Sequence, residues 1–230
     1  MTTLHSAMQA LMMASGTPAD GALHRPPKPV ISISRDHGAL GRQIAVALSK
    51  RLDLPVYDRE ILDHIAKRLE TDPATLKQLD ESNARARDMW LMRLFTGKDL
   101  SEDAYRRCLV DVVLSLARVG GIILGRGSNV ILSTSCALRL RITASPDVCA
   151  RRVAARYSLS MDEARVQIEA INHNRGRFVW ELFHARNSDA STFDMILNTD
   201  RLDDPERAVE CIAAAYNALA DTSSARLKGG

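Results

Sequence analysis

The chain of 230 residues has few aromatic side chains, no long apolar run and only a small excess of positive charge. Aromatic residues make up 4% of it and hydrophobic residues 46%, which predicts a core of aliphatic side chains. No segment has the roughly 20 consecutive apolar residues that a membrane-spanning helix needs. The formal charge of +3 is too small to indicate a nucleic-acid partner by itself. The length and composition favour one domain of ordinary α/β size.

Cysteine is also scarce, and the four cysteines are scattered as Cys108, Cys136, Cys149 and Cys211. None forms a pair at metal-ligand spacing, so we expect buried thiols in a reducing compartment and no structural zinc. The N-terminus lacks the basic segment of an export signal. We therefore expect a cytoplasmic protein.

Arginine is the abundant cation and accounts for 25 of the 31 lysine and arginine residues. A guanidinium group grips two phosphate oxygens at once and stays charged, so this ratio suits phosphate chemistry. Codon bias is the alternative explanation, and for most of these arginines it is the better one. The positions of individual arginines have to decide which of them bind a ligand.

The segment over residues 29–45 combines a short apolar run, a loop with two glycines and a stretch with helical spacing. Glycines let backbone N–H groups surround an anion, and the start of a helix adds partial positive charge. Arg42 follows the second glycine directly, where a cation faces the terminal phosphates of a nucleotide. The predicted phosphate site comprises Ser34, Arg35, His37, Gly38, Ala39, Gly41, Arg42 and Gln43.

This segment departs from the usual P-loop pattern at three positions. Asp36 stands at the first glycine position, Arg42 replaces lysine, and Gln43 replaces the serine or threonine that binds magnesium. An ordinary turn between a strand and a helix therefore remains an alternative interpretation.

The rest of the chain alternates between apolar strand candidates and stretches with helical spacing, which predicts a parallel sheet of about five strands with helices on both faces. Prolines at 26, 27 and 29 exclude regular structure and mark the edge of the domain. The predicted organisation is a disordered leader (1–28), a single domain (29–220) with a helical insertion (71–100) and a lid region (150–190), and a flexible tail (221–230).

Ligands of a parallel sheet bind at the carboxyl ends of its strands, so the residues after each strand are candidates. Asp58 follows the second strand candidate, where it can hold a magnesium-bound water or a sugar hydroxyl, or simply cap the next helix. Arg126 stands between two glycines after the third strand candidate.

A second group of arginines lies between residues 150 and 178. They form either a mobile lid that closes over phosphates or a solvated helix face paired with acidic side chains. The candidates are Arg151, Arg152, Arg156, Arg175 and Arg177.

In this order, the motifs resemble the cytidylate kinase-like family of the P-loop nucleoside monophosphate kinase superfamily, over about residues 28–218. The segments that carry the resemblance are residues 31–45, 55–58, 125–127, 144–152 and 193–199. The resemblance implies a P-loop-type sheet with helical acceptor-site and lid insertions, and transfer of a phosphoryl group from ATP to a cytidylate-like nucleotide. Mg²⁺ is expected to accompany ATP, although no direct protein ligand for it is identified.

The resemblance also assigns roles to particular residues. Arg42 and Arg175 match catalytic arginines, and the matched acceptor-binding residues are Asp58, Arg126, Asn172 and Arg175. Asn172 and Leu124 stand where cytidylate kinases carry aspartates, so the loss of these carboxylates puts base specificity in doubt.

Two other classes of function remain open. Gln43, Leu124 and Asn172 favour a nucleotide-binding regulatory or sensor domain that has lost turnover. A nucleic-acid-binding protein would use the same arginines, but the small net charge disfavours it.

Overall fold

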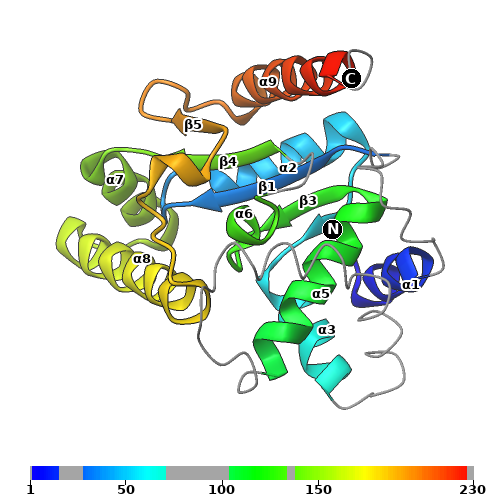
Figure 1. Cartoon of the computed structure of the whole chain (residues 1–230). Helices are drawn as coiled ribbons and strands as arrows, with labels where there is room; N and C mark the ends of the chain where they lie inside the picture. Colours follow the sequence, from blue (N-terminus) through cyan, green and yellow to red (C-terminus); the bar gives the residue numbers. More distant parts are fainter. Residues whose placement is uncertain (1, 16–27, 71–103, 134–137, 227–230) are drawn as a thin grey trace.

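The computed structural model describes residues 2–15, 28–70, 104–133 and 138–226, so the predicted insertion over residues 71–100 lies outside the described residues (Figure 1). Five parallel strands form one sheet in the order β2-β3-β1-β4-β5, which confirms the predicted α/β fold. The strands are β1 (Val30–Arg35), β2 (Val56–Tyr57), β3 (Gly121–Leu124), β4 (Leu138–Thr143) and β5 (Met195–Asn198).

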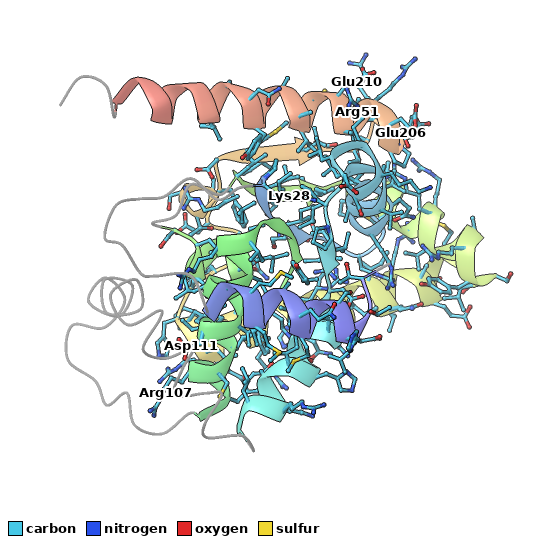
Figure 2. The ribbon with its side chains drawn as sticks, turned by 90° about the vertical axis from the view of Figure 1, so that its right-hand side faces the viewer. Lys28, Arg51, Arg107, Asp111, Glu206 and Glu210 are labelled. Atoms are coloured by element: carbon cyan, nitrogen blue, oxygen red, sulfur yellow. The ribbon has the colours of Figure 1, made fainter. Side chains whose placement is uncertain are left out.

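Helices cover both faces of the sheet, as expected (Figure 1). One face packs against α2 (Gly41–Leu52) and α9 (Pro205–Arg226) through an aliphatic cluster. Figure 2 shows Arg51 of α2 on the same side of the molecule as Glu206 and Glu210 of α9. The other face packs against α3 (Arg59–Glu70), α5 (Ala104–Val119) and the short α6 (Ser128–Ile131). None of the described helices is long and apolar enough to cross a membrane.

The N-terminal residues correct one prediction, because residues 4–15 of the expected disordered leader form α1 (Leu4–Ser15). Ala7 and Leu11 recur at helical spacing and are buried against α3 and α5. Thr2 extends this contact, since its hydroxyl accepts a 2.8 Å hydrogen bond from the amide of Val56. At the other end, α9 continues into the predicted tail.

The two central strands give the sheet one apolar face and one partly polar face. Ile31 and Ile33 of β1 point into the aliphatic cluster, whereas Ser32 and Ser34 belong to the opposite face. In β4 the buried residues alternate with Arg139 and Arg141 in the same way. The side of the sheet away from α2 therefore carries hydroxyl and guanidinium groups.

Two helices after β4 form a hairpin over that polar half of the sheet: α7 (Pro146–Tyr157) and α8 (Met161–Phe183). The predicted capping box is present at the start of α8, because the hydroxyl of Ser160 accepts from the amide of Glu163 and the Glu163 carboxylate accepts from the Ser160 amide. Two of the cysteines match the buried prediction, Cys108 and Cys149, but Cys211 is exposed and Cys136 lies outside the described residues.

A buried hydroxyl pair ties β1 to α6 and predicts a coupled effect on stability. The hydroxyl oxygens of Ser32 and Ser128 are 2.7 Å apart, and both residues are fully or almost fully buried. Ser32→Ala should lower the free energy of unfolding by about 1–3 kcal/mol, because it leaves a buried hydroxyl without its partner. Denaturant titration of both single variants and the double variant should show the double loss to be smaller than the sum. Additive losses would contradict this pairing.

Candidate functional site

The loop between β1 and α2, residues 36–40, has the tight geometry that its glycine predicts. Gly38 has a φ of 86°, and a Cβ atom there would lie 2.8 Å from the carbonyl oxygen of Cys149. Leu40 adopts a left-handed conformation as the residue before α2 and makes no side-chain capping bond. The loop is thus pressed against the start of α7, and its backbone turns sharply into α2.

This geometry leaves backbone donors at the start of α2. Within the described part of the chain, the amides of Gly38, Gly41 and Gln43 donate no hydrogen bond. Unpaired N–H groups and the dipole of a helix together favour an anion at this end. The β1–α2 loop therefore has the backbone features of a phosphate site.

Arg35, at the end of β1, places a guanidinium group between the loop and the neighbouring strand. A Cβ atom on Gly125 would lie 2.5 Å from Nη1 of Arg35, and one on Gly41 would lie 2.6 Å from Cβ of Arg35. Both glycines thus make room for this side chain. Among the described residues, no carboxylate forms an ion pair with Arg35.

Burial and the proximity of Arg175 lower the pKa of Arg35 to about 9. The pKa of Arg175 is also lowered, chiefly by burial. Two cations thus lie close together with little counter-charge, an arrangement that a bound anion would relieve.

Asp58 caps α3, which is one of the roles that its sequence position allows, and its other oxygen faces Arg42. One oxygen, Oδ1, accepts from the amides of Glu60 and Ile61 and caps α3. The other, Oδ2, lies 3.7 Å from Nη2 of Arg42, whose side chain is 55% exposed. Arg42 thus extends from α2 toward the ends of β2 and β3.

A cavity of about 330 Å³ opens beside these residues, at the carboxyl ends of β1 and β3, and we call it the β3-side cavity. Its walls combine cations, amides and apolar groups. The lining includes Ser34, Arg35, Arg42, Asp58, Leu124, Arg126, Asn129, Asn174, Arg175 and Phe178.

Arg126 lines this cavity but is held in place by a neighbour that sequence reasoning missed. Asp63 of α3 accepts two hydrogen bonds from its guanidinium group, one of them 2.7 Å long, and a third of 2.8 Å from the hydroxyl of Tyr105. The Phe178 ring lies 4.1 Å from the guanidinium carbon. No sequence pattern connects Asp63 with Arg126, because the two residues lie on α3 and on the turn after β3.

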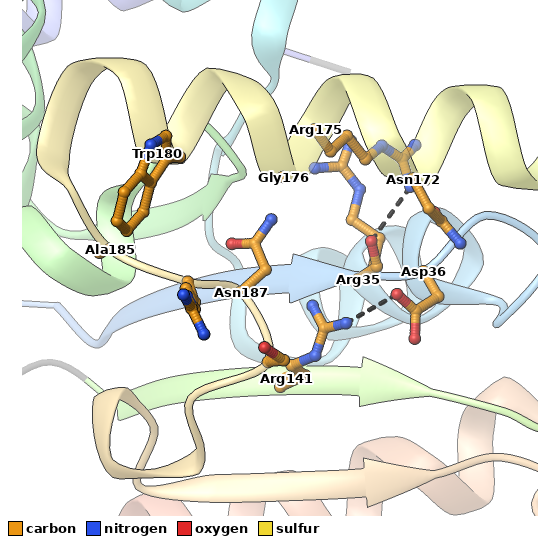
Figure 3. A pocket seen from close by; sticks show the side chains of 11 residues that line it. Arg35, Asp36, Arg141, Asn172, Arg175, Gly176, Trp180, Ala185 and Asn187 are labelled. Carbon is orange, nitrogen blue, oxygen red and sulfur yellow. Dashed lines mark hydrogen bonds and ion pairs between the residues drawn. The ribbon is translucent and has the colours of Figure 1, made fainter.

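Two hydrogen bonds seat helix α8 on the β1–α2 loop, and Figure 3 shows the one between Arg175 and Arg35. Asn172 Oδ1 accepts from the backbone amide of His37 at 2.8 Å, and Nη1 of Arg175 donates to the carbonyl oxygen of Arg35 at 3.0 Å. Asn172 and Arg175, two of the predicted acceptor residues, therefore contact the predicted phosphate site. Residues of that site also line the β3-side cavity.

The remaining residues of the predicted phosphate site mostly make contacts that support the fold. Arg141 donates to the hydroxyl of Ser34, and Ala39 is buried and accepts a bond from Thr199. The His37 ring stacks on Tyr157. Burial is the main cause that lowers the pKa of His37, and the charge of Arg175 lowers it further. Gln43 is exposed at the start of α2.

The other predicted lid arginines do not line the β3-side cavity. Arg152 donates to the hydroxyl and the carbonyl oxygen of Thr199 and lies 3.5 Å from the carbonyl oxygen of Gly38, so it supports the back of the loop. Arg177 pairs with Glu181 on the surface of α8. Arg151 and Arg156 are exposed on α7.

Comparison with known proteins bears on the family and the fold of the chain. The model of the cytidylate kinase-like family matches residues 30–201. No curated sequence among those compared is significantly similar. An uncharacterized protein from Eubacterium ventriosum has a similar solved structure, with a TM-score of 0.64, 19% identity, and coverage of 83% of this chain and 99% of that one. Shikimate kinase from Bacteroides thetaiotaomicron aligns with a TM-score of 0.42, 17% identity, and coverage of 85% and 98%.

The uncompensated charge of Arg35 predicts that removing it stabilises the ligand-free protein. Arg35→Met keeps the aliphatic stem and should raise the melting temperature, by about 2–4 °C per kcal/mol recovered. Burial and the charge of Arg175 disfavour the charged form of Arg35, and the variant removes this cost. Calorimetry at pH 7.5 measures the change in melting temperature.

Arg139→Met is the matched control, since Arg139 makes two side-chain bonds to Asp194 on the same face of the sheet. This variant should lower the melting temperature, because it leaves the Asp194 carboxylate without its partner. Equal losses in both variants would contradict the view that Arg35 is uncompensated.

Proposed function

Since the chain belongs to the cytidylate kinase-like family, we propose that it transfers a phosphoryl group from ATP to a nucleoside monophosphate, with a cytidylate-like acceptor as the first candidate. One observation carries the proposal: Arg35, Arg42 and Arg175 converge between a loop with unpaired amides and the β3-side cavity. Phosphoryl transfer depends on positioning and on charge stabilisation, and these groups supply both.

In the proposed reaction, the terminal phosphates of ATP bind the amides at Gly38 and Gly41 and the side chain of Arg42. An oxygen of the acceptor phosphate forms a bond to the γ-phosphorus atom, and the bond between that atom and the bridging oxygen of ADP breaks. Negative charge is then shared among the transferring oxygens. Arg35 and Arg175 face this region and would stabilise that charge.

The acceptor would occupy the β3-side cavity. Arg126 offers it a guanidinium group whose orientation is fixed by Asp63. Leu124 and Phe178 provide apolar surface for a base, while Asn129 offers an amide near it. An amide both donates and accepts, so base selection here would rest on hydrogen bonding without a carboxylate.

Magnesium would enter with ATP, whose phosphates it binds directly. No group of three potential metal ligands occurs among the residues described, so the phosphates and water would supply most of its ligands. Asp58 Oδ2 is the carboxylate oxygen at the edge of the cavity that can accept from a magnesium-bound water. Asp36 is already engaged by Arg141 and Thr143.

A second candidate function, a nucleotide sensor with weak or no turnover, is favoured by the contact of Asn172 with the loop. The side-chain oxygen of Asn172 takes the His37 amide that a phosphate oxygen would otherwise use. Binding of ATP would then displace α8 and report occupancy through its movement.

The kinase proposal predicts a large loss of turnover when Arg42 is removed. Arg42→Ala should lower kcat by about 10³-fold, the lower end of what a transition-state arginine contributes. ADP release with Mg-ATP and a panel of nucleoside monophosphates measures it. Arg51→Ala, an exposed change on the same helix, is the control and should leave the rate unchanged.

The kinase proposal fails if wild-type protein phosphorylates no member of the panel and Arg42→Ala binds ATP as tightly as wild type. Tight ATP binding without product, together with altered protease sensitivity of α8, would instead support the sensor.

The Asn172 contact predicts opposite effects of two substitutions on ATP binding. Asn172→Ala frees the His37 amide and should lower the Kd for ATP, whereas Asn172→Asp adds negative charge beside the phosphates and should raise it. Calorimetric titration of both variants with ATP measures these two changes in Kd. A Kd that is unchanged in both variants would show that ATP does not use this amide.

A further inference from the structure

A second cavity, of about 350 Å³, shares Arg175 with the β3-side cavity, and we call it the β4-side cavity (Figure 3). The polar face of the sheet contributes Arg141 to it, and α8 contributes Trp180 and Gly176. The segment after α8, residues 185–188, closes one end. No role is proposed above for Arg141, Trp180 or Arg186, which line this cavity and not the β3-side cavity.

The charge of the lining is strongly one-sided. Four arginines line the cavity, namely Arg35, Arg141, Arg175 and Arg186, against the single carboxylate of Asp36. That carboxylate is already engaged, because it accepts from Arg141 and from the hydroxyl of Thr143, each at 2.7 Å. Among the described residues, the other three arginines have no carboxylate partner. An anion is the natural complement of such a lining.

Trp180 and Arg186 line the β4-side cavity and not the β3-side cavity, and the Trp180 ring adds a flat apolar surface. Arg186 lies over the Trp180 ring, with its guanidinium carbon 5.6 Å from the ring centroid. The Trp180 side chain is 48% exposed, although it is the largest apolar group in the lining. At Gly176 a Cβ atom would meet nothing within 4 Å, so the wall next to Trp180 is open. An exposed indole beside guanidinium groups is suited to an anion with an organic part.

Asp36 is the residue of the loop that lines this region. Its carboxylate binds Arg141 on β4, in register with Ser34 of β1, while the amides for ATP lie on the α2 side of the loop. A phosphate near Arg141 and Arg186 would therefore be distinct from the phosphates of ATP. The two cavities do share the guanidinium groups of Arg35 and Arg175 and the amide of Asn187.

We propose that the β4-side cavity is a second binding site, for a phosphate monoester, whose phosphate is held by Arg141 and Arg186 and whose organic part packs against Trp180. A guanidinium fork matches two phosphate oxygens, and the volume lies in the range of small-ligand sites. Because Arg175 faces both cavities, occupancy of this site would influence the charge available to the phosphate loop. The inference concerns binding and does not depend on turnover.

Trp180 itself provides the readout. The chain has two tryptophans, Trp90 and Trp180, so the variant Trp90→Phe leaves Trp180 as the single indole. This variant, saturated with ATP, is titrated with inorganic phosphate, ribose 5-phosphate and CMP in separate arms. We expect a saturable change of emission with at least one probe. The arm with the lowest Kd distinguishes free phosphate from an ester and shows whether a base contributes.

Two further variants locate the bound anion. Arg186 is exposed, so Arg186→Ala should fold normally, which a thermal melt verifies, and should raise the Kd at least 10-fold. Arg186→Glu should abolish binding, because it reverses the charge. Arg165→Ala is the control, since Arg165 is an exposed arginine of α8 outside both cavities. It should leave the Kd unchanged.

The proposal is overturned by either of two results. One is the absence of any emission change or heat of binding with all three probes. The other is binding that survives Arg186→Glu but is lost in Arg42→Ala, which would place the anion beside the phosphate loop, because Arg42 lines the β3-side cavity and not the β4-side cavity. Loss of kinase activity in other variants bears on the proposed function alone, so the two failures are distinguishable.

Discussion

The organisation of this site depends on one uncompensated interaction, the burial of the Arg35 guanidinium beside that of Arg175. Gly41 and Gly125 make room for the Arg35 side chain, and the carbonyl oxygen of Arg35 anchors α8 through Arg175. Like charges held close together away from water cost stability in the ligand-free protein. A bound phosphate converts that cost into affinity, so the arrangement makes sense for a protein whose ligand is an anion. Burial lowers the pKa of both arginines, and the charge of Arg175 lowers that of Arg35 further.

Helix α8 divides the surroundings of these cations into two cavities of similar size. The division is possible because β1 and β4 present serine and arginine side chains on the face that α8 covers, instead of the aliphatic side chains of the opposite face. A fully apolar face would have bound α8 tightly and left no polar space. The ion pair between Arg141 and Asp36 supports this face between β4 and the loop, and the hydroxyl pair of Ser32 and Ser128 fixes the start of α6 below it.

Much of the fold could be predicted because its signals are local. The apolar run from Val30, the capping box at Ser160 and the proline at 205 each mark an element within a few residues of its observed boundary. The leader was the exception, because the prolines after residue 25 suggested disorder. Residues 4–15 instead form α1, which buries Ala7 and Leu11 against α3 and α5. A short amphipathic stretch does not by itself predict a stable helix, because its stability depends on the surface that buries its apolar face.

The sequence by itself determined the order of strands and helices, the glycine loop with its cation and the candidates at the strand ends, because periodicity and turn chemistry act over short distances. Only the tertiary structure decided which charges meet. Asp63 holds Arg126, Asn172 takes the amide of His37, and Arg152 supports the loop from behind, although the sequence placed it in a lid. Pairing of charges depends on distances across the folded chain, and residues far apart in sequence acquire those distances only when the sheet and α8 have packed.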